Sequence, residues 1–595
     1  MSRARDAVVL SFALLLAGCQ GRSVERPSAA LDEDAFREHL RILASDEFQG
    51  RRPGTAGEDR TVAYLIEQFK RLGLKPGNGK EYVQFVPLVE IAALDPPALN
   101  IVGKDRQLTL APGREVVLWT HRTESLVRLD GSEVVFVGHG VVAPEYGWDD
   151  YAGVDVRGKT VLLLSNDPGF FGSDPTLFKG RTMTYYGRWT YKFEEAARHG
   201  AAGALIIHDE AGAGFGWNVV RNTWSGPQLE LATRDNAPFV AANVSRGADG
   251  SASRVAASVT PRAEGKGSPR LAHTGAPPVV EGAAPRVAVE GWISASAART
   301  LLGLAGADLP ALQAAASTQA FRARPLGLTA GTEIKSQVRS FGSSNLLALI
   351  SGAERPRECV VFTAHWDHLG SVTDAAGTHV FHGAVVDASG VAALLTLAQS
   401  MSRTLHRPAR SVLFLFSTAA EEGLLGSAYY VEHPVCAMRD TAAVIDIDPA
   451  HIGGPTRDVQ VVGLGSSELD RYVRAAALLQ GREVRPEPHP ERGNFFGSDQ
   501  FSFAKAGVPG LLARGGIDDA ARGPVWGLAQ EEDYRQHRYR QPADQYSTDW
   551  DVRGTLQDLA LYLDVAERVA RDWRFPNWLP NSEFRAVREK DRPQD

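Results

Sequence analysis

The chain has 595 residues, of which 44% are hydrophobic and 23% charged, and its formal net charge is −7. At roughly 150 residues per domain, this length predicts three or four domain-sized units. No basic stripe is present, which argues against nucleic acid as a partner. The three cysteines are too few for a disulfide framework, and no CxxC pair or Cys/His zinc motif occurs. After residue 20, no run approaches the roughly 18 apolar residues of a membrane-spanning helix.

The first 19 residues have the pattern of an export signal. Arg3 and Arg5 precede an apolar stretch at 7–17, and small residues then lead to Cys19. This order is typical of a secretory signal peptide. The cysteine directly after Ala-Gly resembles a bacterial lipobox, so we expect Cys19 to be lipidated. The protein would then be a lipoprotein of the cell envelope, at the outer membrane and facing the periplasm. A plain signal peptide with an incidental cysteine is the alternative.

Beyond this signal, residues 34–74 show helical periodicity. From Val62 to Phe69, apolar residues stand at i, i+3, i+4 and i+7, which is the spacing of one buried helix face. Gly73 follows as a C-terminal cap. A turn-rich connector at 49–57 separates this helix from an earlier one. We therefore predict two helices in this segment.

Residues 131–290 have a different pattern. Short β runs, such as 133–137 and 160–164, alternate with glycine-rich turns, and a helix is expected at 189–199. Residues 245–285 are rich in Ser, Gly, Ala and Pro, which indicates loops. We interpret the region as an inserted, mainly β module.

From residue 340, predicted strands and helices alternate. Apolar β runs occur at 345–350, 359–364 and 411–417, and a helix is expected at 390–401 between the last two. Strands that alternate with helices of about 10–15 residues predict an α/β sheet with helices on both faces.

Three motifs follow predicted strands, at the edge where an open α/β sheet carries its site. The first contains His365 and Asp367, because a neutral imidazole binds zinc and a nearby carboxylate can hold its other ring nitrogen. The second contains Glu421 and Glu422, one of which can bind a metal while the other takes a proton from metal-bound water. Adjacent glutamates also suit a helix N-terminus. The third is the β run that ends at Asp448, and buried strands rarely carry an aspartate without a partner.

The order and spacing of these motifs resemble the M28 family of zinc aminopeptidases, close to its exported bacterial members with an inserted protease-associated (PA) domain. The resemblance covers almost the whole chain after the signal. It rests on GRRPGT at 50–55, VGHG at 137–140, DDY at 149–151, HWDHLG at 365–370, EEGLLGS at 421–427, SDQFSFA at 498–504 and YRQPAD at 539–544. It implies a zinc-exopeptidase-like α/β fold, in which helices flank a mixed sheet and a β-rich PA-like domain is inserted.

With this resemblance, the chain is expected to divide into seven segments. They are a lipoprotein signal peptide (1–19), a tether (20–33), an N-terminal portion of the peptidase domain (34–114), the PA-like insert (115–290), a helical connector (291–334), a C-terminal portion of the peptidase domain (335–577) and a C-terminal tail (578–595).

The family scheme has two zinc ions that share a bridging aspartate. The resemblance implies that His365 and Asp448 bind the first ion, with Asp367 behind His365. It also implies that Glu422 binds the second ion and that Glu421 is the general base. In this scheme, a metal-bound water attacks the carbonyl group next to a free peptide N-terminus.

Two positions depart from the family pattern. In the segment 383–390, Val386 stands where the bridging aspartate is expected, and Asp387 takes the next position. Arg540 stands where the family has a histidine ligand of the second ion, and a guanidinium has no lone pair to offer. Asp387 can still serve as a ligand after a one-residue slip. A salt bridge from Arg540 to Glu422 or Asp387 would fill the space of the second ion.

Three functions stay open on this sequence. The first is an exopeptidase with one zinc ion, or with a pair re-formed through Asp387. The second is a non-catalytic relative that binds peptides or an envelope partner. The third is another chemistry on the same scaffold, such as cyclisation of N-terminal glutamine with one zinc ion. We expect a peptide or protein N-terminus as substrate or ligand, and zinc as the cofactor, with one ion favoured over two and the absence of zinc left open. Cys359 and Cys436 can pair if the compartment is oxidising.

Overall fold

The computed structural model describes residues 31–172, 174–233, 285–375, 377–404 and 407–592. The predicted signal peptide, Cys19 and most of the predicted tether lie outside the described residues. Most of the loop segment predicted at 245–285 also lies outside them.

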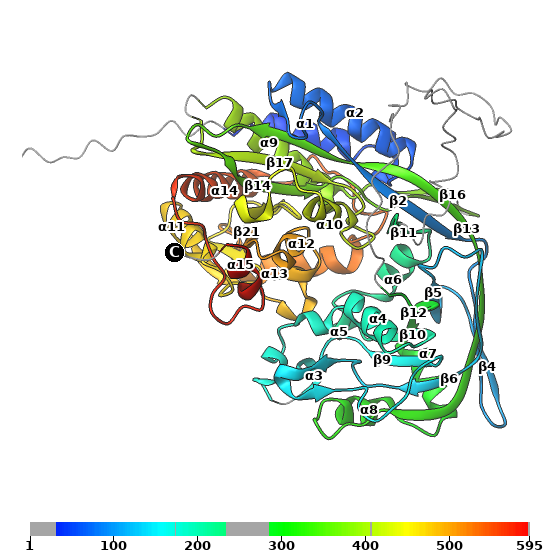
Figure 1. The fold of residues 1–595 in the computed structure, drawn as a ribbon. Helices are drawn as coiled ribbons and strands as arrows, with labels where there is room; N and C mark the ends of the chain where they lie inside the picture. The colour runs from blue at the N-terminus through cyan, green and yellow to red at the C-terminus, as the bar shows by residue number, and fades with distance from the viewer. Residues whose placement is uncertain (1–30, 173, 234–284, 376, 405–406, 593–595) are drawn as a thin grey trace, which may run out of the picture.

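The main strands form one hydrogen-bonded assembly of 17 strands, which we describe as two sheets that share β13 (Figure 1). The strands of the first sheet are β2 (Val83–Ala93), β13 (Arg324–Ile350), β14 (Arg355–His365), β17 (Arg410–Ser417), β18 (Thr441–Asp446), β19 (Asp458–Val461), β20 (Glu483–Pro486) and β21 (Gly510–Gly515), with the short β1 (Lys75–Pro76) and β11 (Gln228–Leu231) at its edges. β14 lies between β17 and β18, and β18 pairs with β21, all in parallel. β13 is antiparallel to both β17 and β2. The central strands are buried on both faces, which explains why they read as continuous apolar runs.

Helices cover both faces of this sheet, as Figure 1 shows for the upper face. On one face are α1 (Glu33–Leu43), α2 (Ala56–Arg71), α9 (Gly390–Ser402), α11 (Leu469–Leu479) and α14 (Arg553–Arg571), and on the other are α10 (Leu425–Glu432) and α12 (Gln500–Lys505). The two helices predicted before residue 74 are therefore present. The predicted α/β fold, a mixed sheet flanked by helices, is confirmed. The stretch Ala384–Ser402 is long and apolar enough to cross a membrane, but 94% of it is buried inside the fold, so it is a core helix.

The second sheet belongs to the inserted region. Its strands are β3 (Leu99–Val102), β4 (Gln107–Leu110), β5 (Val116–Trp119), β6 (Leu126–Phe136), β9 (Thr160–Leu164), β10 (Gly203–His208) and β12 (Val289–Ser294). α4 (Trp189–Arg198) and α6 (Trp217–Trp224) cover one face, whereas α7 (Ala295–Leu304) and α8 (Leu309–Ala316) cover the other. The region interpreted as mainly β thus carries helices on both faces of its sheet.

The strands β3 and β4 lie in the segment 34–114, which the sequence assigns to the peptidase domain. In the structure they pair with each other and, through β3, with the stretch of β13 that also pairs with β6. Residues 99–110 therefore belong to the sheet of the insert, and the first sheet takes no strand from them. Short strands that alternate in polarity fit either sheet, so the pairing is decided by contacts far along the chain.

A single strand, β13, connects the two sheets. Its N-terminal half pairs with β6, with Ile334 opposite Val127, and its C-terminal half pairs with β2, with Ser336 opposite Ala93. In Figure 1, β13 runs along one side of the molecule from the insert to the first sheet. The two sheets are thus held together by one continuous strand.

The remaining elements are short or lie at the periphery. They are α3 (Pro168–Phe171), α5 (Glu210–Ala213), α13 (Gly523–His537), α15 (Arg585–Asp591), and two hairpins formed by β7 (Val142–Ala143) with β8 (Trp148–Asp149) and by β15 (Gly370–Asp374) with β16 (Gly377–Phe381).

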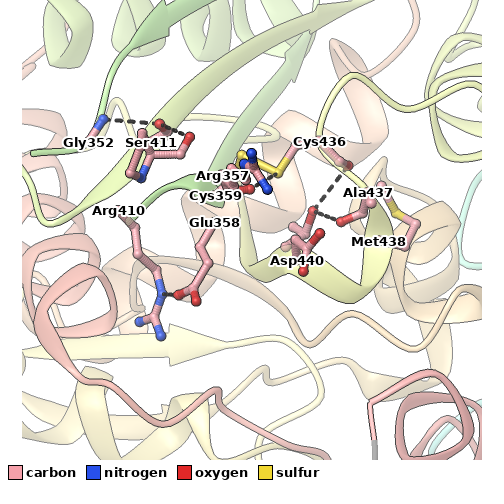
Figure 2. The surroundings of a disulfide bond; sticks show 12 residues. Gly352, Arg357, Glu358, Cys359, Arg410, Ser411, Cys436, Ala437, Met438 and Asp440 are labelled. Atoms are coloured by element: carbon pink, nitrogen blue, oxygen red, sulfur yellow. Dashed lines mark hydrogen bonds and ion pairs between the residues drawn. A yellow bond between two sulfur atoms is a disulfide. The ribbon is translucent and has the colours of Figure 1, made fainter. Parts of the chain in front are cut away.

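A disulfide joins Cys359, near the start of the apolar stretch of β14, to Cys436, in the loop after α10 (Figure 2). Nearby, Arg410 Nε lies 2.6 Å from Glu358 Oε2, and the same guanidinium donates to backbone carbonyls at the end of α14. The pairing that the sequence left open is therefore present in the structure.

Candidate functional site

β14 ends at His365, and the loop that follows brings Asp367 behind it. His365 Nδ1 lies 3.1 Å from the carbonyl oxygen of Asp367 and 3.5 Å from its Oδ1. The carboxylate of Asp367, which is fully buried, accepts hydrogen bonds from the backbone N–H groups of Ala420 (3.0 Å) and Glu421 (3.3 Å). Asp367 therefore connects the loop of the first motif to the turn that carries the two glutamates.

Three side chains that the sequence analysis singles out converge at this strand end. The ligand atoms of His365, Asp387 and Asp448 all lie within 4.8 Å of one another. His365 Nε2 is 3.8 Å from Asp448 Oδ1, and Asp387 Oδ2 accepts from the backbone N–H of His365 at 3.2 Å. Across the described ranges, this is the one group of three or more His, Cys, Asp or Glu side chains with such spacing. We call it the His365 cluster.

The electrostatics of the His365 cluster favour a cation among its side chains. Burial and the charge of Asp448 raise the pKa of Asp387 well above its usual range. Burial, with the charge of Glu421, also raises the pKa of Asp448 to about 6. Burial alone would lower the pKa of His365, but the hydrogen bond to Asp367 and the neighbouring carboxylates raise it well above 6.5. Crowded carboxylates in a low-dielectric site repel one another, and a bound dication would relieve that repulsion.

The turn that carries Asp387 is held by a residue of the YRQPAD segment. The carboxylate of Asp544, fully buried, accepts from the backbone N–H groups of Val385 (3.0 Å) and Val386 (3.3 Å). Val386 itself lines the cleft and supplies no ligand atom. The bridging position of the family pattern is therefore occupied by an apolar side chain.

Glu421 lies between two cationic or polar partners. Its Oε2 forms an ion pair with Arg540 Nη2, and its Oε1 lies 2.7 Å from His368 Nδ1. Burial alone would raise the pKa of Glu421, but the charge of Arg540 and the adjacent His368 hold it well below its usual range. The salt bridge expected from Arg540 to Glu422 or Asp387 is thus made to Glu421, because Glu421 is the residue of the pair that faces the cleft.

Glu422 lies outside the His365 cluster. Its Oε1 accepts from Arg52 Nη1 at 3.0 Å, and Arg52 also donates to the carbonyl oxygen of Pro227 at 2.8 Å. Of the two adjacent glutamates, Glu421 lines the cleft and Glu422 does not. The sequence assigned Glu422 to a second metal ion, whereas in the structure its partner is a guanidinium.

The insert positions Arg540. Two residues of α6 contact it: Asn222 Nδ2 donates to the carbonyl oxygen of Arg540 at 3.0 Å, and Arg540 Nη1 donates to Thr223 Oγ1 at 3.3 Å. Arg540 therefore connects a helix of the insert to Glu421 on the peptidase side of the cleft.

Arg51 holds two of the three segments that carry the His365 cluster, those of His365 and Asp387. It is fully buried and donates to the carbonyl oxygens of Trp366 (2.9 Å), His382 (2.7 Å) and Gly383 (3.0 Å), as well as to that of Leu43. No role for Arg51 or Arg52 was predicted from the sequence, although both stand in the GRRPGT segment. Their partners lie far along the chain, so no local pattern could identify them.

The site opens into a cleft of about 450 Å³ between the two sheets. The peptidase side supplies His365, Glu421, Asp448 and Arg540. The insert supplies a cation and three aromatic side chains, namely Arg188, Trp189, Phe215 and Trp224. No sequence pattern predicted this contribution from the insert.

Comparison with known proteins agrees with these motifs. Residues 345–564 match the sequence model of peptidase family M28. Mouse aminopeptidase NAALADL1 is 33% identical over 128 residues, which cover 20% of this chain and 16% of the mouse protein. The vacuolar membrane protease of Schizophyllum commune is 32% identical over 164 residues, which cover 27% of this chain and 15% of the fungal protein. The chain thus spans less than a fifth of the length of these curated relatives.

Two solved structures are similar over most of the chain. The aminopeptidase from Aneurinibacillus sp. strain AM-1 is 19% identical, with 91% of this chain and 93% of that chain covered and a TM-score of 0.46. The zinc aminopeptidase of Bacillus subtilis is 16% identical, with 91% of this chain and 95% of that chain covered and a TM-score of 0.41. The part of the chain that resembles peptidase family M28, residues 345–564, carries the His365 cluster, both glutamates and Arg540.

Proposed function

We propose that this protein is a single-zinc aminopeptidase, which hydrolyses N-terminal peptide bonds with one zinc ion bound by His365, Asp387 and Asp448. The observation that carries the proposal is the convergence of these three ligand atoms within 4.8 Å at the wall of the cleft. One imidazole nitrogen and two carboxylates form a donor set of the kind found in catalytic zinc sites, which use three protein ligands and a water.

A zinc ion bound there would polarise the scissile carbonyl and supply a water of lowered pKa. The side chains around it have separate tasks. Asp367 fixes the orientation of the His365 ring through the contacts at Nδ1. Glu421 faces the same cleft, and its carboxylate is our candidate to accept a proton from the attacking water once one of its present contacts opens. Arg540 keeps Glu421 ionised and in place.

The same ion pair predicts a slow enzyme. A general base works best when its pKa lies near the working pH, and Arg540 holds the pKa of Glu421 far below that. Because a guanidinium takes the place of the second ion's histidine ligand, we propose one zinc ion and a low rate of hydrolysis.

A second candidate is peptide binding without hydrolysis. It is favoured by the contacts of Glu421, since both of its carboxylate oxygens already have a partner, Arg540 on one side and His368 on the other. If neither contact opens when a peptide enters, the cleft would hold the peptide N-terminus without cutting it.

We further propose that the protein acts in an oxidising compartment of the cell envelope, as a lipoprotein anchored through Cys19. Support comes from the disulfide between Cys359 and Cys436, because such bonds persist in exported proteins and are rare in the cytosol. Labelling with a fatty-acid analogue, compared between the wild type and Cys19→Ser, tests the anchor. Absence of label from the wild type would contradict it.

The main proposal is tested by zinc content and activity of the purified chain on aminoacyl p-nitroanilides. We expect one zinc ion per chain and slow hydrolysis that stops in a chelator and returns with zinc. Two zinc ions per chain would contradict the single-ion site. No zinc, together with measurable peptide binding, would favour the second candidate.

A further inference from the structure

We propose that the cleft carries a carboxylate-binding subsite built on Arg188 of the insert, so that its ligands are peptides with a free carboxylate close to their N-terminal end. This inference rests on the proposed function only in taking the ligand of the cleft to be a peptide. It adds the charge of that ligand and the residue that recognises it.

Arg188 precedes α4 and reaches from the insert toward the peptidase side. A Cβ atom at Gly497 would lie 3.5 Å from Arg188 Nη1, so the guanidinium lies against the backbone there. Its Cζ is 5.3 Å from the centre of the Trp189 ring. Among the residues that the structure describes, no carboxylate pairs with Arg188 and no side-chain or carbonyl oxygen accepts from its guanidinium. Its N–H groups are therefore free to bind a ligand.

The other arginines of the cleft differ in this respect. Arg492 pairs with Glu532 at 2.6 Å, Arg522 pairs with Asp519 at 3.0 Å, and Arg538 pairs with Asp533 at 3.1 Å. Arg540 pairs with Glu421. Arg514 pairs with Glu531 at 3.8 Å, and Arg535 has no carboxylate partner but donates to Asn494 Oδ1 at 3.3 Å. Within the described part of the chain, Arg188 is therefore the cleft arginine with neither a carboxylate partner nor an oxygen that accepts from its guanidinium.

The surroundings of Arg188 make this charge unfavourable in the absence of an anion. Burial, and then the charge of Arg540, lower the pKa of Arg188 to about 10. Two like charges on the facing sides of one partly desolvated cleft repel each other. A ligand carboxylate between them would remove the repulsion and form charge-assisted hydrogen bonds with the planar guanidinium.

The aromatic side chains beside Arg188 on the insert side of the cleft suit a peptide that carries a carboxylate. Trp189 and Trp224 lie edge to face with ring centres 5.3 Å apart, and Phe215 lies 6.0 Å from Trp224. These rings offer apolar surface beside a single fixed cation, and a volume of about 450 Å³ accommodates a short peptide. A carboxylate can come from an acidic first side chain or from the C-terminus of a very short peptide, and the chemistry that Arg188 recognises is the same.

The test is equilibrium binding of short peptides to the full chain, measured by calorimetry with zinc and again in chelator. Four probes separate the two sources of the carboxylate. Glu-Ala-Ala-amide and Gln-Ala-Ala-amide differ only in the first side chain, whereas Ala-Ala-Ala and Ala-Ala-Ala-amide differ only at the C-terminus. Each probe is titrated into the wild type, Arg188→Gln, Arg188→Lys and the control Arg157→Gln. Arg157 lies on the insert surface with 79% of its side chain exposed.

We expect the charged member of at least one pair to bind the wild type about tenfold more tightly than its neutral counterpart, as one charge-assisted contact allows. The preference should be lost in Arg188→Gln, retained in part in Arg188→Lys and unchanged in Arg157→Gln. It should also weaken as salt is added. A melting curve shows whether Arg188→Gln is folded. If it is not, the partial loss of the carboxylate preference in Arg188→Lys tests the inference instead.

Equal binding within both pairs, no binding of any probe, or a preference that survives in folded Arg188→Gln would each overturn the inference. Failure of the proposed function gives a different result. Missing zinc or missing hydrolysis, with the carboxylate preference intact and dependent on Arg188, would refute the aminopeptidase and leave the subsite in place.

Discussion

The guanidinium of Arg540 is paired with the carboxylate of Glu421, the residue that the family scheme makes the general base. Arg540 is one of the two departures from the family pattern, whereas Glu421 stands at a position that the pattern retains. The pair puts a fixed cation beside the His365 cluster, on the side where the scheme has its second ion. A guanidinium cannot bind a metal, and its charge lowers the pKa of Glu421. On our proposal, the pair takes the place of the second ion.

Asp367→Asn tests the positioning of His365. The amide keeps the shape of the side chain but loses the charge that holds the ring nitrogen and the turn at Glu421. We expect zinc affinity to fall about 10- to 100-fold, the usual effect of losing such an outer partner. Zinc titration against a chromophoric chelator measures it. As a control, Asp374→Asn changes an exposed carboxylate of the β15–β16 hairpin and should leave zinc affinity as it is. An unchanged affinity in Asp367→Asn would show that the ring is fixed by other contacts.

Arg51→Ala removes the buried guanidinium that holds the carbonyl oxygens of Trp366, His382 and Gly383. Because these acceptors would be left without a donor, we expect the free energy of unfolding to fall by about 3 kcal/mol or more. Urea denaturation measures the loss. Zinc affinity should fall as well, since the segments that carry His365 and Asp387 lose their common support. Arg60→Ala, an exposed change on α2, is the matched control. A stable Arg51→Ala variant with normal zinc affinity would contradict this role.

Glu58 predicts a pH dependence of stability. The side chain is 6% exposed, accepts from Gly54 N and Ser343 Oγ, and burial raises its pKa from 4.5 to about 7. Between these values the folded state binds a proton that the unfolded state has lost. The free energy of unfolding therefore falls as the pH rises through this window, by on the order of 3 kcal/mol in all.

Glu58→Gln should remove this slope, and urea denaturation from pH 4.5 to 8 measures it. Glu67→Gln on the exposed face of α2 serves as the control, and its pH profile should match that of the wild type. A Glu58→Gln variant with the wild-type slope would assign the pH dependence to another group.

The sequence predicts the local features of this structure well and the long-range contacts poorly. The alternation of apolar runs correctly predicts β14, α9 and β17, because a strand buried on both faces needs an unbroken apolar sequence. The motif positions His365 and Asp448 converge as the family scheme implies, since both follow neighbouring parallel strands of one sheet.

The contacts that were missed join residues far apart in sequence. Arg52 meets Glu422 across 370 residues, and Arg188 approaches Arg540 from the other domain. Neither pair can be recognised from periodicity or residue spacing in the sequence, because each contact depends on how distant segments pack around the cleft. The direction of each glutamate at 421 and 422 is likewise set by the turn that follows β17, and residue type alone does not specify it.

The last prediction concerns repair of the second metal site. Val386→Asp with Asp387→Asn would supply the bridge, and Arg540→His would supply a terminal ligand and free Glu421 from its ion pair. We expect the combined variant to bind two zinc ions and to gain aminopeptidase activity that Glu421→Gln abolishes. Zinc content and hydrolysis of aminoacyl p-nitroanilides measure both effects.

Neither repair alone should add a second zinc ion, because the bridge and the terminal ligand serve the same ion and such ligands act as a unit. The bridge repair alone also takes the Asp387 carboxylate from the proposed single-zinc site, so the new carboxylate at position 386 must replace it there. The gain also depends on Glu422, which must exchange Arg52 for the metal. Fast, chelator-sensitive hydrolysis by the wild type that falls in Arg540→His alone would contradict this expectation. Arg540 would then belong to a working site, because its charge would be assisting the reaction that the lost ligand is expected to limit.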